Sequence, residues 1–346
     1  MRPIFVNTKI LQYHTTGVQR YLLEMLAEIG PHLTPLQPAQ RREGIRGHLW
    51  EQTELLVQSA RGVLWSPSIT GPLFHPRQVV SMHDVVPLDH PEWLSRQFAQ
   101  WYRWLTPRLA RSAKHIITIS EYSKSRIVHH SGISPDKITV TLLAADRRFC
   151  PRTELETRTL LGPLNLPSSR YVLSIGSIEP RKNTVRLLEA WRDIQARLEP
   201  DLWLVVTGAK GRSQVFSEVG LSEIPPRVHF TDHVPDEVLP HLYSGATAFV
   251  YPSLYEGFGL PPLEAMASGV PVTTSNVTSL PEVVGDAALM VDPSSTAELA
   301  GAMLRLLEDE NLRCRLSSAG LMRAQRFSWR EAAAQTLSIL EQVAHD

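Results

Sequence analysis

Glu256 and Glu264 lie on either side of a glycine-containing turn, an arrangement that suits a phosphorylated, hydroxyl-rich ligand. Gly257 and Gly259 let a ligand approach the backbone closely, because glycine has no side chain and reaches positive φ. Glu256 is expected in the loop, where it faces the ligand. Glu264 is expected one turn into the helix that follows, where a carboxylate accepts hydrogen bonds from vicinal hydroxyls such as those of a ribose or hexose. The alternative interpretation is a loop and a helix with two surface glutamates.

A short helix predicted over 263–267 adds an anion site at its start. Pro261 and Pro262 suit a first helical turn, and Gly269 is typical of the position after a helix end. Free N–H groups and the positive end of the helix dipole attract anions. Since the two prolines donate no hydrogen bond, the donors are expected from the flanking amides, namely those of Phe258, Gly259, Leu260 and Leu263.

Two adjacent cations follow a candidate strand in the same half of the chain. The apolar run 171–176 predicts a buried strand ending in Gly176, and Arg181 and Lys182 come after it, just before a predicted helix. Arginine offers a planar fork and lysine a compact charge, a combination that suits a diphosphate. Such a pair is merely solvated in most proteins, but its place at a strand end favours anion binding.

Further candidates come from other strand ends. Ligands of open parallel sheets lie beyond the carboxyl ends of the strands, which is where His83 follows the predicted strand 78–82. A packed or surface histidine is the alternative. Gly17 precedes a helix predicted over 18–29 and either brings backbone close to a phosphate or simply begins the helix. Lys210 and the backbone near 231–234 are expected beside the ligand and its base.

Candidate strands and helices alternate along the whole chain, which predicts an α/β protein with parallel, doubly wound sheets. With 346 residues, the chain is long enough for two domains, expected over 1–150 and 151–330. Residues 31–46 are expected as a solvated loop and 146–169 as an interdomain linker. The strands are predicted at 4–7, 62–65, 78–82, 115–120, 138–142, 171–176, 202–207, 228–231, 248–251, 270–274 and 288–291.

Composition narrows the possible functions. The formal net charge is zero, which argues against bulk electrostatic binding of nucleic acid. The two cysteines suit a reducing compartment, no signal-peptide pattern is seen, and no apolar run is long enough to span a membrane. A cytoplasmic location is therefore expected.

A helix predicted over 91–112 gives two interpretations. Its expected buried stripe consists of Leu94, Phe98, Trp101, Leu105 and Leu109. The arginines and aromatics off this stripe form either a solvated basic face or a surface that meets anionic lipid or a lipid-linked molecule.

The segments EGFGLPPLEAMASGVPV and SNVTSLPEVVGDAALMVDP, together with HDVVPL and GSIEPRKN, resemble glycosyltransferase family four, a retaining group with the GT-B fold. The resemblance implies two Rossmann-like domains facing a cleft, with an acceptor-side domain at 1–150 and a nucleotide-sugar-binding domain at 151–330. It also implies that the last helix, 331–346, packs back on the first domain. The implied roles are ribose binding by Glu264, donor-sugar or phosphate contact by Glu256, donor-sugar contact by His83, and diphosphate contact by Arg181 and Lys182.

The expected function is thus transfer of a hexose, favoured as mannose or a deoxy-mannose from a GDP-sugar, to a growing, lipid-linked polysaccharide. Charge on the departing diphosphate must be stabilised, and the cations and loop amides suit this task without metal. No D-x-D triplet occurs in the chain, so metal independence is expected and no cofactor is called for. A nucleotide-sugar epimerase, a phosphorylase and a non-catalytic nucleotide-sugar sensor remain alternatives.

Overall fold

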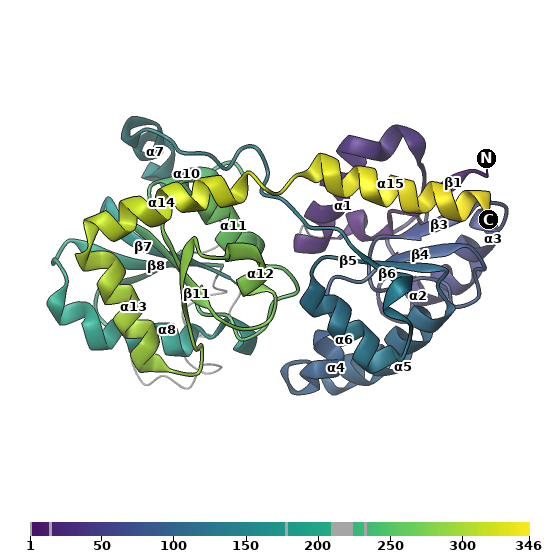
Figure 1. Cartoon of the computed structure of the whole chain (residues 1–346), viewed down its shortest axis with the longest axis horizontal. Coiled ribbons are helices and arrows are strands. Elements are labelled where there is room, and N and C mark those ends of the chain that lie inside the picture. The colour runs from purple at the N-terminus through teal and green to yellow at the C-terminus, as the bar shows by residue number, and fades with distance from the viewer. Residues whose placement is uncertain (1, 14–15, 177–178, 209–223, 232–233) are drawn as a thin grey trace. The chain divides into compact units, whose positions relative to one another are not determined.

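The computed structural model describes all residues except 1, 14–15, 177–178, 209–223 and 232–233. The described chain divides into two compact units: unit 1 comprises Met1–Leu143 and Ser328–Asp346, and unit 2 comprises Ala144–Phe327. Each unit is built on a parallel six-stranded sheet flanked by helices (Figure 1). The α/β class and the doubly wound sheets predicted from the sequence are confirmed.

In unit 1 the strand order is β2-β1-β3-β4-β5-β6, and every neighbouring pair is parallel. The strands are β1 (Ile4–Asn7), β2 (Thr34–Leu36), β3 (Val63–Ser66), β4 (Gln78–Ser81), β5 (His115–Thr118) and β6 (Ile138–Val140). The helices are α1 (Gly17–Ile29), α2 (Gly44–Trp50), α3 (Leu56–Ser59), α4 (Val86–Asp89), α5 (Arg96–Ser112), α6 (Glu121–Ser131) and α15 (Trp329–His345). Helix α15 packs against α1 and β3.

The expectation of a solvated loop over 31–46 is wrong. This stretch contains strand β2 and the start of helix α2, which continues through a π-helical turn, Glu51–Leu55, into α3. Trp50 and Leu55 are buried against Leu64 of β3. Burial of these large apolar side chains stabilises a segment whose charged and glycine residues suggest a loop.

Helix α5 confirms most of the helix predicted over 91–112, but its buried stripe differs from the prediction. Leu105 and Leu109 are buried as expected, whereas Phe98 is 45% exposed. The smaller Ala99 and Ala110 take buried places instead. Trp101, expected on the buried stripe, and Tyr102, which lies off it, both line a cavity.

In unit 2 the strand order is β12-β11-β10-β7-β8-β9, again parallel throughout. The strands are β7 (Arg170–Ile175), β8 (Leu202–Thr207), β9 (Val228–Thr231), β10 (Ala248–Tyr251), β11 (Val272–Ser275) and β12 (Ala288–Val291). The helices are α7 (Glu154–Leu161), α8 (Thr184–Ile194), α10 (Leu239–Ser244), α11 (Leu260–Ala267), α12 (Leu280–Val284), α13 (Thr296–Glu308) and α14 (Glu310–Ala324).

Both faces of the second sheet are buried, as parallel sheets require. Alternate residues of one strand point to opposite faces, so Leu173 joins a cluster with Phe249 and Met266, while Val172 joins one with Trp191. This packing fixes the strand ends from which the loops of unit 2 emerge.

In unit 2 the structure differs from the prediction in two segments. The segment 146–169 is not an open linker, because it contains helix α7, which packs against α10. Helix α14, which the sequence analysis did not predict, packs against α11. Cys150 and Cys314 are both free thiols.

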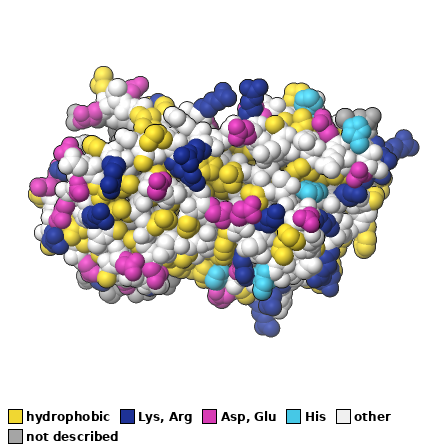
Figure 2. All heavy atoms as spheres, in the orientation of Figure 1, with side chains coloured by type: hydrophobic (Ala, Val, Ile, Leu, Met, Phe, Trp, Pro, Cys, Tyr) yellow, Lys and Arg dark blue, Asp and Glu magenta, His cyan; other side chains and the backbone are white. Residues whose placement is uncertain are grey.

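Two features concern the surface of the described chain. Basic and acidic side chains are interspersed on the face drawn in Figure 2, in keeping with the formal net charge of zero. Among the described helices, none combines the length and the apolar character needed to cross a bilayer.

Candidate functional site

The strand order of unit 2 has a topological switch point between β7 and β10. From β7 the chain first adds β8 and β9 on one side, then returns to add β10 to β12 on the other. Ligands of such sheets bind beyond the carboxyl ends of the strands at this point, because the connecting loops diverge there. Arg181 and Lys182 follow β7, and Glu256 follows β10, so all three predicted residues emerge at the switch point.

Glu256 binds both cations. Its Oε1 accepts a hydrogen bond from Lys182 Nζ at 2.6 Å, and its Oε2 accepts one from Arg181 Nη1 at 3.2 Å. Tyr251 and Ser253 donate their hydroxyls to Oε1, each at 2.7 Å. Lys182 Nζ also contacts the hydroxyl of Tyr251. The predicted cation pair and the first predicted glutamate therefore form one hydrogen-bonded cluster.

Glu256 lies in the loop between β10 and α11, as predicted, and is only 8% exposed. Burial alone raises the pKa of a carboxyl, but Lys182 and Arg181 outweigh it and lower the pKa of Glu256 to about 2. Burial lowers the pKa of Lys182, and Glu256 opposes that shift. Glu256 thus holds the two cations and is ionised at neutral pH.

The glycine turn and the helix start have the predicted form. Gly259 has φ of 120°, and a Cβ there would lie 2.8 Å from Leu280 Cδ2, so only glycine fits without strain. Helix α11 begins at Leu260 with both prolines in its first turn, and Gly269 follows its end with φ of 76°.

The amides of this turn differ in whether a protein group accepts their hydrogen bonds. Leu263 N–H donates to Gly259 O at 3.3 Å, so its predicted role as an anion donor is wrong. Within the part of the chain that the structure describes, the N–H groups of Phe258, Gly259 and Leu260 have no hydrogen-bond partner. These three amides therefore remain available as donors before the start of α11, as the predicted anion cradle requires.

Glu264 is buried in α11 at 3% exposure and accepts a hydrogen bond from the Tyr243 hydroxyl at 2.9 Å. Tyr243 orients the carboxylate, a contribution that the sequence analysis missed.

Gly176 makes room for the lysine. A Cβ at residue 176 would lie 3.2 Å from Lys182 Cγ and 3.3 Å from Lys182 Cδ. Asn183, with φ of 57°, follows the cations and donates its Nδ2 to the carbonyls of Pro252 (3.1 Å) and Pro293 (2.8 Å). The segment that carries the cations is thereby attached to the loops after β10 and β12.

Besides Tyr243, four hydroxyl-bearing residues of the site were missed by the sequence analysis. Ser279 Oγ donates to the carbonyls of Glu256 (2.9 Å) and Phe258 (2.7 Å), and Thr278 Oγ1 accepts from Glu256 N at 3.3 Å. Tyr251 and Ser253 contact the glutamate as described. All four lie within or next to the motifs quoted from the sequence, at or just after strand ends. This position was the signal from which a role in the site could have been predicted.

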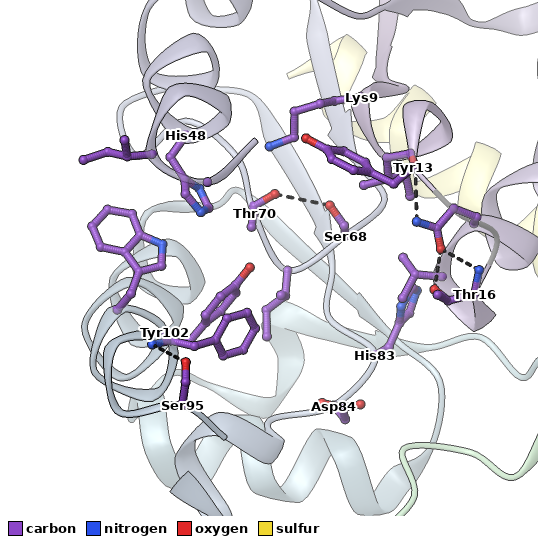
Figure 3. A pocket seen from close by; sticks show the side chains of 18 of the residues that line it. Lys9, Tyr13, Thr16, His48, Ser68, Thr70, His83, Asp84, Ser95 and Tyr102 are labelled. Carbon is purple, nitrogen blue, oxygen red and sulfur yellow. Dashed lines mark hydrogen bonds between the residues drawn. The ribbon is translucent and has the colours of Figure 1, made fainter. Parts of the chain in front are cut away.

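In unit 1, His83 lies at the end of β4 and lines a cavity of about 1010 Å³ (Figure 3). Its ring packs edge-on against Tyr21 at 4.5 Å, and burial lowers its pKa to about 4, so it is neutral at physiological pH. Its Nε2 has no hydrogen-bond partner among the described residues. Gly17 is an exposed residue at the start of α1 with open space around it.

Two of the predicted candidates, Lys210 and the part of the base-contacting segment at 232–233, lie outside the described residues.

Comparison with protein families gives two matches. Residues 163–322 match the family described as glycosyl transferases group 1, and residues 56–146 match glycosyltransferase family 4. The first lies within unit 2 and contains every residue of the switch-point site described above.

Comparison with characterised proteins points the same way. The chain is 37% identical to O-antigen chain mannosyltransferase B of Escherichia coli over 264 residues, which is 76% of this chain and 69% of that protein. It is 32% identical to MMP alpha-(1->4)-mannosyltransferase of Mycolicibacterium hassiacum over 72% of this chain and 59% of that protein. Those two enzymes are thus longer than the region they share with this chain.

Solved structures share the fold along the whole chain. Sucrose-phosphate synthase from Thermosynechococcus elongatus superposes with a TM-score of 0.76 at 20% identity, covering 99% of both chains. HepE from Anabaena, in complex with UDP-glucose, gives a TM-score of 0.75 at 18% identity, covering 98% of this chain and 100% of that one. These likenesses confirm the predicted GT-B fold.

Proposed function

Because the chain belongs to glycosyltransferase family 4, we propose that it transfers a hexose from a nucleoside diphosphate sugar to a growing polysaccharide, with retention at the anomeric carbon. The favoured donor is a GDP-sugar of mannose or a deoxy-mannose. The mannosyltransferase names of the two relatives support this choice. The favoured acceptor is a lipid-linked glycan, supported by the O-antigen name of the first relative.

One observation carries the proposal. At the switch point of unit 2, the pair Arg181 and Lys182 is held by Glu256, and the amides of residues 258–260 that follow it have no hydrogen-bond partner among the described residues. In the reaction the bond between the anomeric carbon and the diphosphate oxygen breaks, and the diphosphate keeps the electron pair. A bond forms from the anomeric carbon to an acceptor hydroxyl, which loses its proton. The cations and amides stabilise the charge on the departing diphosphate.

The proposed reaction uses no metal ion. Arginine and lysine neutralise phosphate charge directly, and three backbone amides at a helix start add further donors. Removal of divalent cations with a chelator is expected to leave activity unchanged, whereas a loss that Mg²⁺ or Mn²⁺ restores would contradict this part of the proposal.

The buried carboxylate of Glu264 is proposed to bind the nucleotide ribose, and His83 the donor sugar. A neutral histidine accepts or donates one hydrogen bond per ring nitrogen, which suits sugar hydroxyls. Its role requires no proton transfer.

Helix α5 supports a proposed contact with anionic membrane on the cytoplasmic side. Trp104 is 42% exposed and stacks beneath Arg108 at 4.7 Å, and Arg96 and Arg103 are also exposed. Aromatic side chains and arginines on one surface helix suit the lipid interface. Sedimentation with vesicles containing anionic lipid, but not with neutral vesicles, is the expected result, and it is expected to weaken in Arg103→Glu.

A thermal-shift screen with GDP-, UDP-, dTDP- and ADP-sugars tests the donor, because a bound ligand raises the melting temperature by an amount that grows with its affinity and with the logarithm of its concentration. Stabilisation by GDP-sugars is expected; stabilisation by UDP-sugars alone would contradict the mannose assignment. Product analysis then separates the alternatives. Conversion of the donor without acceptor indicates an epimerase, sugar phosphate formed with free phosphate indicates a phosphorylase, and binding without turnover indicates a sensor.

A further inference from the structure

Ser279 joins two loops at the carboxyl end of the unit 2 sheet. It lies after β11 and immediately before α12, a helix that contacts α11 (Figure 1). The residue is fully buried, and its hydroxyl donates a shared hydrogen bond to the carbonyl oxygens of Glu256 at 2.9 Å and Phe258 at 2.7 Å. A side chain from the segment after β11 therefore holds two peptide groups of the loop after β10.

A carbonyl that is held in this way also orients the amide on the other side of the same peptide bond. The peptide group is planar and trans, so its N–H points roughly opposite to its C=O. Because the Phe258 carbonyl is directed toward Ser279, the N–H of Gly259 is directed away from it. Within the described chain that N–H has no hydrogen-bond partner. The serine hydroxyl therefore sets the direction in which one of the three available amides donates.

The next amide along the chain is oriented in a different way. Gly259 O accepts a hydrogen bond from Leu263 N at 3.3 Å, so this carbonyl points along α11. The N–H of Leu260 belongs to the same peptide group and points out of the helix start. The helix itself thus orients the Leu260 amide, whereas the Gly259 amide depends on a side chain from another loop.

The residue before the serine has a backbone conformation that costs free energy. Thr278 has φ of 60°, in the left-handed region, which a β-branched residue rarely occupies. Its Oγ1 accepts a hydrogen bond from Glu256 N at 3.3 Å, so it contacts the same loop as the serine. Strain of this kind persists only where the surrounding structure fixes it, and it is frequent at functional sites. The strained backbone therefore agrees with a role for residues 278–279 in shaping the loop.

We infer that Ser279 is a positioning residue, which directs the amide of Gly259 toward a phosphate oxygen of the bound nucleotide. The inference rests on the proposed function and deepens it, because it assigns the orientation of one anion donor to a particular side chain. Since Ser279 is fully buried, it acts through the backbone and not by contact with the ligand.

Loss of the serine hydroxyl would remove a restraint from the peptide group between Phe258 and Gly259. Both signs of φ are open to glycine, so a peptide group beside it rotates more readily than one between two larger residues. A donor that is already oriented stabilises the charge that develops on the diphosphate, whereas a donor that must first turn adds a reorganisation cost. The hydroxyl thus matters for phosphate and not for the nucleoside.

Isotope labelling makes this one amide observable by NMR on the full chain. Phe258 and Gly259 form the only phenylalanine–glycine pair in the sequence, so carbonyl-¹³C phenylalanine with ¹⁵N glycine marks a single amide signal. Titration with GDP is expected to move its proton downfield, because a hydrogen bond to a phosphate oxygen deshields the proton. Guanosine, which has no phosphate, is expected to leave the signal nearly in place.

Ser279→Ala then tests the role of the hydroxyl. It is expected to reduce the shift of the Gly259 signal and to weaken GDP binding about tenfold, the loss typical of one hydrogen bond. Guanosine binding is expected to stay unchanged, whereas a merely structural role would weaken both ligands alike. Ser59→Ala is the matched control, because Ser59 is also fully buried and donates to a backbone carbonyl, that of Leu55 at 2.6 Å, but lies in unit 1. It is expected to change neither measurement.

Three results would overturn the inference: a Gly259 signal that stays in place in the wild type when GDP binds, equal shifts and affinities in the wild type and Ser279→Ala, or equal losses for GDP and guanosine. The wild-type titration needs no variant, so it tests the inference even where Ser279→Ala does not fold. Failure of the proposed function has a different signature, namely that no nucleotide sugar stabilises the wild-type chain in the thermal-shift screen. Pyrophosphate, which has neither base nor sugar, then replaces GDP as the probe of Gly259 and decides the inference by the first two criteria.

Discussion

Lys182 Nζ lies 2.6 Å from Glu256 Oε1, so the cation that faces the proposed diphosphate is already held by a carboxylate. The ammonium is therefore already in position when the ligand binds, and preorganised charge is more effective in catalysis than mobile charge. The carboxylate also keeps the cluster from accumulating two unpaired positive charges. Glu256 acts in this way as a positioning residue.

Glu256→Gln tests the structural side of this arrangement. Removing one partner of a buried ion pair leaves an uncompensated charge, so the free energy of unfolding is expected to fall by about 2–4 kcal/mol. Urea denaturation measures it. Glu179→Gln is the control, because Glu179 pairs with the same Arg181 but has a 44% exposed side chain. A similar loss in both variants would contradict the assignment.

The same carboxylate predicts a dependence of stability on pH. The pKa of Glu256 is lowered from 4.5 to about 2 in the folded chain. Its contribution is therefore complete above about pH 4.5 and is lost as pH falls toward about 2. The difference in unfolding free energy between wild type and Glu256→Gln is expected to shrink across this window. Urea denaturation at pH values above and within this pH range measures the difference. A difference that does not change with pH would show that the ionised pair contributes nothing to stability.

Arg181→Ala and Lys182→Ala are each expected to lower turnover about 10²–10³-fold, the typical loss when one strong electrostatic stabiliser is removed. Steady-state kinetics with the donor found in the screen measures the loss. Arg192→Ala, at an exposed position on α8, is the control. Unchanged turnover in both site variants would remove the main support for the proposed reaction.

Glu264→Gln tests the ribose assignment. Loss of a hydrogen bond to a charged group is expected to weaken nucleotide binding by roughly 1.5–3 kcal/mol. Calorimetry of the wild type and of Glu264→Gln is carried out with GDP and with a GDP analogue that lacks the ribose hydroxyls. It measures whether the substitution and the analogue remove the same contact. Their effects are therefore expected not to add. Fully additive effects would place the ribose elsewhere.

Two glycine substitutions separate strain from ligand approach. Gly259→Ala is expected to destabilise the fold by about 1–3 kcal/mol, because φ is 120° and the new Cβ meets Leu280. Gly17→Ala meets nothing within 4 Å and is expected to leave stability nearly unchanged. Thermal denaturation compares them. Nucleotide titration of Gly17→Ala then shows whether this glycine approaches the ligand, because only a close approach would weaken binding.

The sequence was sufficient for features that depend on local chemistry. Apolar runs predicted every described strand except β2, and the paired prolines with Gly259 predicted the start of α11 correctly, because each preference acts within a few residues.

Features that depend on distant partners were missed. Nothing near Glu256 in the chain shows that Lys182 would pair with it, since 74 positions separate them. The segment from α2 to α3 was missed because its stability comes from packing of Trp50 and Leu55 against β3. The grouping of polar residues around the unit 1 cavity, which include Lys9, His48 and Thr70, escaped prediction for the same reason, because they come from segments far apart in the sequence.

Asn183 donates through one side-chain amide to carbonyls that follow two different strands. When the chain is heated toward its melting temperature, loss of the Asn183 side-chain hydrogen bonds would release both loops together. The hydrophobic core of unit 2 would still be packed at that point. Nucleotide binding is therefore expected to be lost at a lower temperature than the far-ultraviolet circular dichroism signal of the helices. Heat would inactivate the chain before it unfolds it.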